Sequence, residues 1–311
     1  MKSGFILICG IPNAGKSTFL NMMIGEKISG VTDKPQTTRK RIKGIYTSAS
    51  SEIQLVFIDT PGFHKSNTLF NRLLNDEIFE TTTDIDCFLF IMDGSTGITD
   101  DEKELLASIN ELVSKHSKPA IAIVNKTDLG INKEKMDYLR SINLFKQILQ
   151  ISCLTDKTEN QKKDKNLEIS QKRENISRII ANYLDEQSFF YPEDQLSDIS
   201  EKEQVEEIIQ EKLYLYLHQE IPYKVFSEVL LFKEDEDKIY IDANICCKKE
   251  SQKPIIIGKN AEVIKKVRLS AEKDLKFIFG KKVKLNLFVK VSNNWTKNKM
   301  ILKDMGYNIR K

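Results

Sequence analysis

The chain of 311 residues contains no run of about 18 apolar residues, which argues against a transmembrane helix. Its five cysteines are odd in number and lack the spacing of a disulfide framework or zinc site, so we expect buried thiols in a reducing compartment. No small-residue cleavage site follows the N-terminal apolar run, so we expect no signal peptide and a cytoplasmic protein. Hydrophobic residues make up 40% of the chain, which is enough for sizeable cores. At about 150 residues per domain, the length predicts two domains.

Charge is divided unevenly along the chain. Residues 246–311 hold 18 Lys and Arg against five Asp and Glu, which leaves 30 basic and 40 acidic residues for residues 1–245. A basic C-terminal part on an acidic body is typical of proteins that bind polyanions, with nucleic acid as the first candidate and an anionic membrane surface as the second. The alternative is a lysine-rich solvated surface.

Buried strands alternate with helices in the first half of the chain. Continuous apolar runs predict strands at Phe5–Cys9, Leu55–Ile58, Cys87–Met92, Ala120–Val124 and, more weakly, Ile148–Ile151. Helical patterns occupy Lys16–Ile24, Leu69–Thr82, Asp100–Lys115 and Lys133–Ser141. Arg41–Thr47 alternates apolar and polar residues, as in an antiparallel edge strand beside Glu52–Ile58. The sequence therefore predicts an α/β fold with a doubly wound, mostly parallel sheet.

The second half predicts a smaller α+β domain. Thr155–Glu174 is polar and lysine-rich and indicates an exposed, mobile loop, after which Asn175–Leu184 closes the first domain as a helix. We predict domains at residues 1–187 and 201–311, joined by a linker at 188–200. In the second domain we expect helices at Glu201–Gln219, Asn260–Phe279 and Asn298–Met305, and strand-like runs at Val225–Phe232, Lys238–Ile245, Pro254–Ile257 and Val283–Val291. Helices would cover one face of a three-stranded sheet.

A glycine-rich phosphate-binding motif follows the first strand and opens the first helix. It consists of Gly10, Ile11, Pro12, Asn13, Ala14, Gly15, Lys16 and Ser17, with Thr18 next to it. Backbone N–H groups of such a loop face a phosphate chain, and the helix N-terminus favours negative charge. We expect Lys16 to reach the β- and γ-phosphates and the Ser17 hydroxyl to bind Mg²⁺.

Two further segments have the chemistry of a phosphate sensor. Asp59, Thr60, Pro61 and Gly62 follow a buried strand, where Asp59 can hold Mg²⁺ through a water and the Gly62 N–H can sense a γ-phosphate; Phe63 comes next. Gln36, Thr37, Thr38 and Arg39 lie in a segment without periodicity, where a hydroxyl can complete the Mg²⁺ shell as part of a switch. The residues do not decide between Thr37 and Thr38, and we favour Thr38.

A base-reading motif follows the strand at Ala120–Val124. Asn125, Lys126, Thr127 and Asp128 fit this role because the Asp128 carboxylate can accept two hydrogen bonds from guanine, whereas adenine has no matching pair of donors. Lys126 can lie along the base, and Asn125 can tie the motif to the phosphate loop. Ser152 and Cys153, after the next strand, can offer a backbone N–H to the guanine O6. The bland alternative is a capped turn.

In this order the motifs resemble those of translation-factor-related GTPases, and the resemblance is closest to the Era family of bacterial ribosome-assembly GTPases. It extends over nearly the whole chain and includes the segments 34–39, 191–194, 221–223, 256–259 and 289–291, with Trp295. The resemblance implies a P-loop GTPase domain followed by a type II K homology (KH) domain. It also implies GTP hydrolysis, binding of the 3′ end of small-subunit ribosomal RNA, assistance to 30S assembly, and peripheral contact with the inner membrane. We expect a monomer.

Two features of the resemblance bear on the rate of hydrolysis. Phe63 stands where Ras-like proteins have the glutamine that orients water, so intrinsic hydrolysis should be slow. In relatives with this phosphate loop, an asparagine such as Asn13 helps to hold a potassium ion that replaces an arginine finger. We carry this over as a hypothesis of K⁺ dependence beside Mg²⁺.

The expected RNA-binding loop is Gly258, Lys259, Asn260 and Ala261. KH domains clamp four nucleotides with a GXXG loop, and here alanine replaces the last glycine. Ala261 is tolerable if its φ is helical, although its methyl group can weaken RNA binding or slightly displace the loop. Lys259 can contact phosphate together with Lys265, Lys266 and Arg268 on the following helix. An ordinary helix start is the alternative for the loop alone.

Two other functions remain open, and a third is disfavoured. The chain can be an RNA-binding assembly factor whose hydrolysis is incidental, or a membrane-surface GTPase whose basic domain binds anionic lipid. A tRNA-modification GTPase is disfavoured, because the basic domain follows the GTPase domain and no cysteine-terminated catalytic motif ends the chain.

Overall fold

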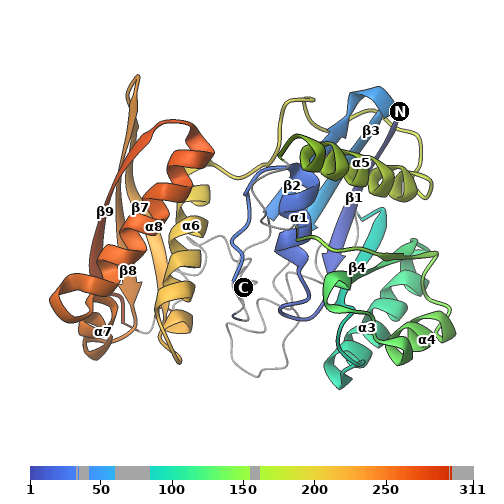
Figure 1. Cartoon of the computed structure of the whole chain (residues 1–311), viewed down its shortest axis with the longest axis horizontal. Coiled ribbons are helices and arrows are strands. Elements are labelled where there is room, and N and C mark those ends of the chain that lie inside the picture. The colour runs from blue at the N-terminus through green and yellow to red at the C-terminus, as the bar shows by residue number, and fades with distance from the viewer. Residues whose placement is uncertain (33, 35–41, 60–84, 155–161, 294, 296–311) are drawn as a thin grey trace. The chain divides into compact units, whose positions relative to one another are not determined.

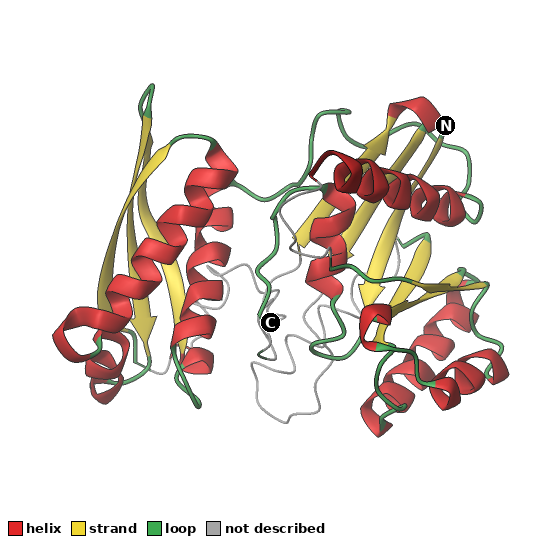
Figure 2. Ribbon diagram, in the orientation of Figure 1, coloured by secondary structure: helices red, strands yellow, loops and turns green. Residues whose placement is uncertain are grey.

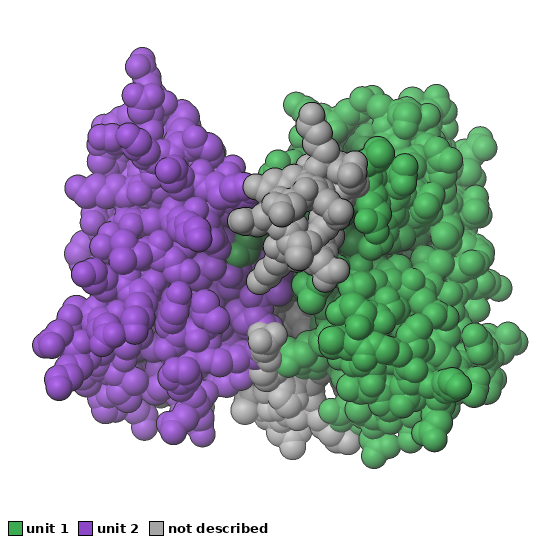
Figure 3. All heavy atoms as spheres, viewed as in Figure 1, with its two compact units in different colours: residues 1–28, 39–67, 74–198 green, residues 29–38, 68–73, 199–311 purple. Residues whose placement is uncertain are grey.

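The chain divides into two compact units in the computed structural model (Figure 3). The structure describes residues 1–32, 34, 42–59, 85–154, 162–293 and 295, and for residues 162–166 the backbone only. One unit comprises residues 1–28, 39–67 and 74–198, and the other comprises residues 29–38, 68–73 and 199–311. Among the described helices, none combines the length and the apolar character needed to cross a membrane.

The first unit is built on a six-stranded sheet in the order β2-β3-β1-β4-β5-β6 (Figure 1). The strands are β1 Lys2–Cys9, β2 Ile42–Ser48, β3 Ile53–Asp59, β4 Cys87–Asp93, β5 Ala120–Asn125 and β6 Gln147–Gln150. All neighbours are parallel except β2 and β3, which run antiparallel. The predictions of a mostly parallel doubly wound sheet and of an antiparallel edge strand are therefore confirmed.

Helices pack on the two faces of this sheet (Figure 2). The helices of the unit are α1 Lys16–Ile24, α3 Asp100–His116, α4 Lys133–Ser141 and α5 Lys162–Ala181, with short 3₁₀ turns at Ala49–Ser51 and Thr127–Leu129. On one face, Leu105 of α3 and Met136 of α4 join a core with Phe88. On the other face, Phe19 of α1 meets Phe57 edge to face at 5.8 Å.

The prediction of a loop at Thr155–Glu174 is wrong from Lys162 onward, where α5 begins. The segment lacks apolar periodicity but is rich in lysine, glutamate and glutamine, which form solvated helices readily. Ile176 and Ile180 are buried and attach the second half of the helix to the unit. Residues 155–161, and the predicted helix at Leu69–Thr82, lie outside the described residues.

The segment expected as a linker lies along the edge of the first unit as far as residue 198. The Gln54 side chain accepts hydrogen bonds from the N–H groups of Phe190 and Tyr191 at 2.8 and 3.0 Å and donates to the Tyr191 carbonyl at 2.9 Å. Lys43 forms an ion pair with Asp198 at 3.0 Å. Residues 188–198 are thus fixed to β2 and β3.

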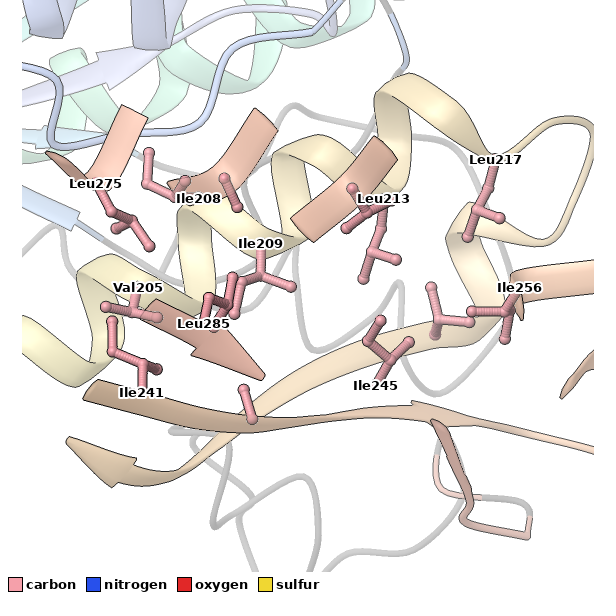
Figure 4. Close-up of a cluster of buried hydrophobic side chains, with 14 of the residues drawn as sticks. Val205, Ile208, Ile209, Leu213, Leu217, Ile241, Ile245, Ile256, Leu275 and Leu285 are labelled. Carbon is pink, nitrogen blue, oxygen red and sulfur yellow. The ribbon is translucent and has the colours of Figure 1, made fainter. Parts of the chain in front are cut away.

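The second unit has a three-stranded sheet covered by helices on one face (Figures 1 and 4). Its strands are β7 Val225–Glu234, β8 Lys238–Cys247 and β9 Lys282–Val291, with β7–β8 antiparallel and β8–β9 parallel. Its helices are α6 Glu201–Tyr216, α7 Lys253–Ile257 and α8 Glu262–Phe279, with 3₁₀ turns at Pro222–Lys224, Glu250–Gln252 and Lys259–Ala261. Ile209, Ile245 and Leu285 form part of the core between helices and strands (Figure 4). The predicted α+β arrangement is confirmed.

The prediction of a strand at Pro254–Ile257 is wrong, because these residues belong to helix α7. A short apolar run does not distinguish a strand from a buried helical turn. Pro254 lies in the first turn of the helix, where its missing N–H costs no hydrogen bond, and Ile256 is buried in the core. The helix expected at Asn298–Met305 lies outside the described residues.

Candidate functional site

The phosphate loop joins the end of β1 to the start of α1. Gly15, the residue before the helix, has φ 97°, and a Cβ there would lie 2.2 Å from Nδ2 of Asn125. Only glycine fits this position without displacing the asparagine. The predicted residues Gly10–Ser17 therefore form one turn at the carboxyl edge of the sheet, where ligands bind in doubly wound folds.

The Lys16 side chain is folded back over this loop. Its Nζ donates hydrogen bonds to the carbonyl oxygens of Gly10 at 3.1 Å and Ile11 at 3.0 Å. Burial lowers the pKa of Lys16, and the nearby carboxylate of Asp59 acts in the opposite direction. The amine is thus held beside the backbone that is expected to surround the phosphates.

Ser17 and Asp59 meet between α1 and the end of β3. The Ser17 hydroxyl donates to Oδ2 of Asp59 at 2.8 Å. Two adjacent oxygen ligands fit Mg²⁺, which prefers oxygen and takes most of its remaining ligands from water and phosphate. Within the described ranges, no group of three or more His, Cys, Asp or Glu side chains would hold a metal by itself. Thr38, the other switch residues Gln36–Arg39, and Thr60–Phe63 lie outside the described residues.

Asn125, the last residue of β5, connects the phosphate loop to the segment after β6. Its Nδ2 donates to the Ala14 carbonyl at 3.2 Å, and its Oδ1 accepts from the Cys153 N–H at 3.1 Å. The side chain is buried. Asn125 thus lies beside the phosphate loop, as the sequence predicts. The Cys153 N–H, one of the groups considered for the guanine O6, donates to Asn125 in this structure.

Lys126 is held by Asp93, a residue that the sequence analysis did not single out. The Lys126 Nζ lies 2.7 Å from Oδ2 of Asp93, and Ser95 donates two hydrogen bonds to Oδ1. Burial raises the pKa of Asp93, but the hydrogen bonds from Lys126 and Ser95 outweigh it and hold this pKa below its ordinary value. Asp93 is the last residue of β4 and pairs with Asn125, the last residue of β5. Alignment of the two strand ends would therefore have identified Asp93 as a neighbour of the motif.

Asp128 lies exposed in the 3₁₀ turn after Lys126. The Ser152 hydroxyl donates to its Oδ1 at 2.5 Å, and Lys172 donates to the Ser152 carbonyl at 3.2 Å. The carboxylate that should read the base is therefore oriented by a side chain from the loop after β6. Lys172 on α5 supports that loop, and it too was absent from the sequence prediction.

The expected RNA loop of the second unit precedes α8. Gly258 has φ 77°, and a Cβ there would lie 2.5 Å from the Val263 side chain. Asn260 and Ala261 also have positive φ, 52° and 58°. The condition set for Ala261 is thus not met, because its backbone is left-handed rather than helical. Left-handed alanine costs about 1–2 kcal/mol, so the replacement of glycine strains this loop.

The basic residues around this loop differ in availability. Lys259 and Lys265 are exposed, and Lys266 forms an exposed ion pair with Glu262 at 2.8 Å. Arg268 makes two hydrogen bonds to Glu272, at 2.9 and 3.1 Å, and Glu272 also accepts from the Leu285 N–H. Arg268 is therefore bound within the unit, which makes the three lysines better candidates for phosphate contacts.

Comparison with known proteins matches both units to described families. Residues 5–126 match a family model described as a 50S ribosome-binding GTPase, and residues 220–296 match one described as a KH domain. The chain is 37% identical over 310 residues to the GTPase Era of Geobacter sp. (strain M21), covering 98% of each chain. It is 38% identical over 316 residues to the GTPase Era of Syntrophus aciditrophicus (strain SB), covering 99% of this chain and 95% of that one.

Two solved structures resemble the whole chain. A single-residue variant of Aquifex aeolicus Era bound to GDP and AlF₄⁻ matches with a TM-score of 0.85 at 28% identity, covering 99% of this chain and 100% of that chain. Era in complex with MgGDPNP and nucleotides 1506–1542 of 16S ribosomal RNA matches with a TM-score of 0.84, also at 28% identity and with the same coverage.

Proposed function

Because the chain belongs to the Era family of GTPases, we propose that it is a guanine-nucleotide switch that binds small-subunit ribosomal RNA near its 3′ end and assists assembly of the 30S subunit. The chain is a GTPase, which converts GTP and water to GDP and phosphate. The observation that carries the proposal is the convergence of Lys16, Ser17, Asp59, Asn125 and Asp128 at the carboxyl edge of one sheet.

Guanine recognition in this proposal rests on Asp128. Its carboxylate accepts hydrogen bonds from the N1–H and exocyclic amine of guanine, while Ser152 orients it. Adenine would leave the carboxylate without donors, and an unpaired charged acceptor is costly when a ligand covers it. Lys126, fixed by Asp93, lies along the base, and Asn125 holds the base-reading and phosphate-binding segments together.

Phosphate binding rests on the loop at Gly10–Ser17 and on Thr18. Ser17 and Asp59 would hold Mg²⁺, with Thr38 proposed as a further ligand; the ion neutralises charge on the phosphates when it is bound. Gly62 is proposed to sense the γ-phosphate. Phe63 cannot orient the attacking water, so we propose slow intrinsic hydrolysis.

Asn13 is proposed to make hydrolysis depend on K⁺. It lies exposed in the phosphate loop with φ 64°, and a carboxamide oxygen suits an alkali cation. Turnover measured in KCl and in NaCl at equal ionic strength tests this, with faster hydrolysis expected in KCl. Equal rates would remove the proposed role of Asn13.

RNA binding is proposed for the second unit, through Gly258–Ala261 with Lys259, Lys265 and Lys266. The support is the match of residues 220–296 to KH domains and the 16S RNA bound by the similar Era structure. Lys259→Glu should weaken binding of an RNA copying nucleotides 1506–1542 and leave nucleotide binding intact. Lys202→Glu, at an exposed position of α6, is the control. Equal RNA affinity of wild type and Lys259→Glu would contradict this placement.

Switching itself is tested by measuring RNA affinity with a GTP analogue, with GDP and without nucleotide. Different affinities are expected, and equal affinities would reduce the protein to an RNA-binding factor with incidental hydrolysis.

We keep the predicted domain boundaries, a monomeric state and peripheral contact with the cytoplasmic face of the membrane as proposals. Binding to anionic vesicles at the same salt concentration tests the last of these, and a preference for vesicles over RNA would favour the lipid-binding alternative.

A further inference from the structure

The second unit presents a sheet face that its helices do not cover. Strand residues alternate between two faces, and Ile239, Ile241 and Leu285 point into the core beneath α6 and α8. Their neighbours in β7, β8 and β9 therefore point to the opposite face. We call this the outer sheet face and define it by Lys233, Tyr240, Lys282, Lys284, Phe288 and Lys290.

The outer sheet face is positively charged. All four of its lysines are exposed. Lys233 forms an exposed ion pair with Asp235 at 3.4 Å, whereas no carboxylate among the described residues lies within ion-pair distance of Lys282, Lys284 or Lys290. Along β9 these three lysines occupy outward positions that are spread over most of the strand. Such a row can follow the phosphates of an extended strand.

Two aromatic side chains lie among these lysines. Phe288 is 53% exposed, which is unusual for so apolar a ring, and Tyr240 is half-buried. Tyr240 is paired across the sheet with Lys284 on one side and Lys233 on the other. Phe288 lies four positions after Lys284 on β9, or about 13 Å away at about 3.3 Å per residue. The face thus offers two separate flat rings between cations.

The centre of the face is polar. Asn286 donates to the Asp242 carboxylate at 2.8 Å, and Asn244 donates to Glu228 at 3.2 Å. At one end, Trp295 packs on Phe226 with ring centroids 4.9 Å apart. A surface that inserts into a lipid bilayer needs a continuous apolar face, which these amides and carboxylates interrupt. Rings on an open sheet among basic residues are instead the usual platform for unpaired bases.

We propose that the outer sheet face is a second RNA-binding surface, which takes single-stranded RNA by stacking bases on Phe288 and Tyr240 and binding phosphates with Lys284 and Lys290. It is distinct from the loop Gly258–Ala261, which precedes a helix on the covered side of the sheet. This inference rests on the proposed RNA-binding function. It extends the RNA footprint beyond the four nucleotides that a GXXG loop clamps.

The test uses the full chain and a labelled 37-nucleotide RNA with the sequence of 16S nucleotides 1506–1542. Phe288→Ser should lower its affinity about fivefold to a hundredfold through lost stacking. Phe277→Ser is the matched control, because Phe277 is 87% exposed on α8 and lies outside the outer sheet face.

Lys284→Gln with Lys290→Gln should reduce the salt slope of binding by about 1.4, at about 0.7 for each phosphate contact on a single strand. Lys115→Gln with Lys202→Gln controls for net charge, and ultraviolet crosslinking of the wild type should place RNA on Tyr240 or Phe288.

The outcomes separate this inference from the function on which it rests. No binding of the RNA by the wild type would overturn the proposed function together with this surface. Wild-type binding that the Phe288 and Lys284/Lys290 variants leave unchanged would overturn the second surface alone. Loss of binding to anionic vesicles in those variants, with RNA binding intact, would also overturn it and assign the face to lipid.

Discussion

Asn125 donates a hydrogen bond of 3.2 Å to the carbonyl oxygen of Ala14, although 111 residues separate them in the chain. The same side chain accepts from the Cys153 N–H. One buried carboxamide therefore fixes the phosphate loop, the end of β5 and the loop after β6 in a single arrangement. We therefore expect Asn125 to couple guanine recognition to phosphate recognition.

Replacing Asn125 tests this coupling. Asn125→Ala should lower affinity for GDP about tenfold to a hundredfold, because it leaves two buried backbone groups without partners, at about 1–3 kcal/mol. Fluorescence titration with a labelled GDP analogue measures the effect. Asn110→Ala, at an exposed position of α3, should bind like the wild type. Unchanged affinity in Asn125→Ala would mean that the connection is dispensable.

Asp93 should make stability depend on pH in acid. Its pKa is lowered in the folded state, so its contribution is complete above the ordinary aspartate pKa of about 4 and is lost as the pH falls through the lowered value. Asp93→Asn should cost about 1–2 kcal/mol of unfolding free energy at pH 7, and the difference from wild type should shrink below about pH 4. Denaturant titrations across this range measure it. Asp100→Asn is the control, because the Asp100 side chain is 98% exposed, and its stability should show no such trend. A stability difference between wild type and Asp93→Asn that does not change with pH would contradict the lowered pKa.

Ala261→Gly should stabilise the second unit or leave its stability unchanged. Glycine relieves about 1–2 kcal/mol of left-handed strain, against which its greater freedom in the unfolded chain costs about 0.4–1 kcal/mol. Removal of the methyl group should also raise RNA affinity. Ala107→Gly, in right-handed and exposed helix α3, should instead destabilise by about 1 kcal/mol. Equal destabilisation by both substitutions would contradict the left-handed conformation of Ala261.

Lys135 and Glu102 form a buried ion pair next to Asp93. Their side chains are 0% and 1% exposed and lie 3.0 Å apart, and Lys135 also donates to the Asp93 carbonyl at 2.7 Å. Lys135→Met should cost about 3–5 kcal/mol because it leaves Glu102 charged and buried. Adding Glu102→Gln, which can keep the capping box of α3, should restore part of this. Lys103→Met breaks an exposed ion pair and should lower the unfolding free energy by at most about 1 kcal/mol. Thermal unfolding measures both variants, and a similar loss of stability in Lys103→Met and Lys135→Met would contradict the role of burial.

The strands and most helices were predictable because their apolar patterns are long and regular. The proximity of the motif residues was predictable too, since strand ends at one edge of a parallel sheet bring Ser17 near Asp59 and Asn125 near Ala14. Asp93 was not found because a single aspartate at a strand end has no pattern of its own. Its role depends on the register between β4 and β5, which single-sequence patterns do not specify.

Other differences arise from tertiary packing. Residues 188–198 were expected to form a linker, but Gln54 and Lys43 bind their backbone and side chains across a long sequence separation. Helix α7 has too few residues to show a period, and Ile256 becomes helical in the context of the core. The left-handed φ of Ala261 could not be predicted either. A left-handed position is recognised in a sequence by its glycine, and this chain has alanine there.

The most direct measurement of the central claim is calorimetric titration of the purified chain with Mg²⁺ and non-hydrolysable analogues of GTP and ATP. We predict binding of the GTP analogue and none of the ATP analogue, and we expect Asp128→Asn to lose the preference for guanine. Heat from the ATP analogue and none from the GTP analogue, on folded protein, would contradict it.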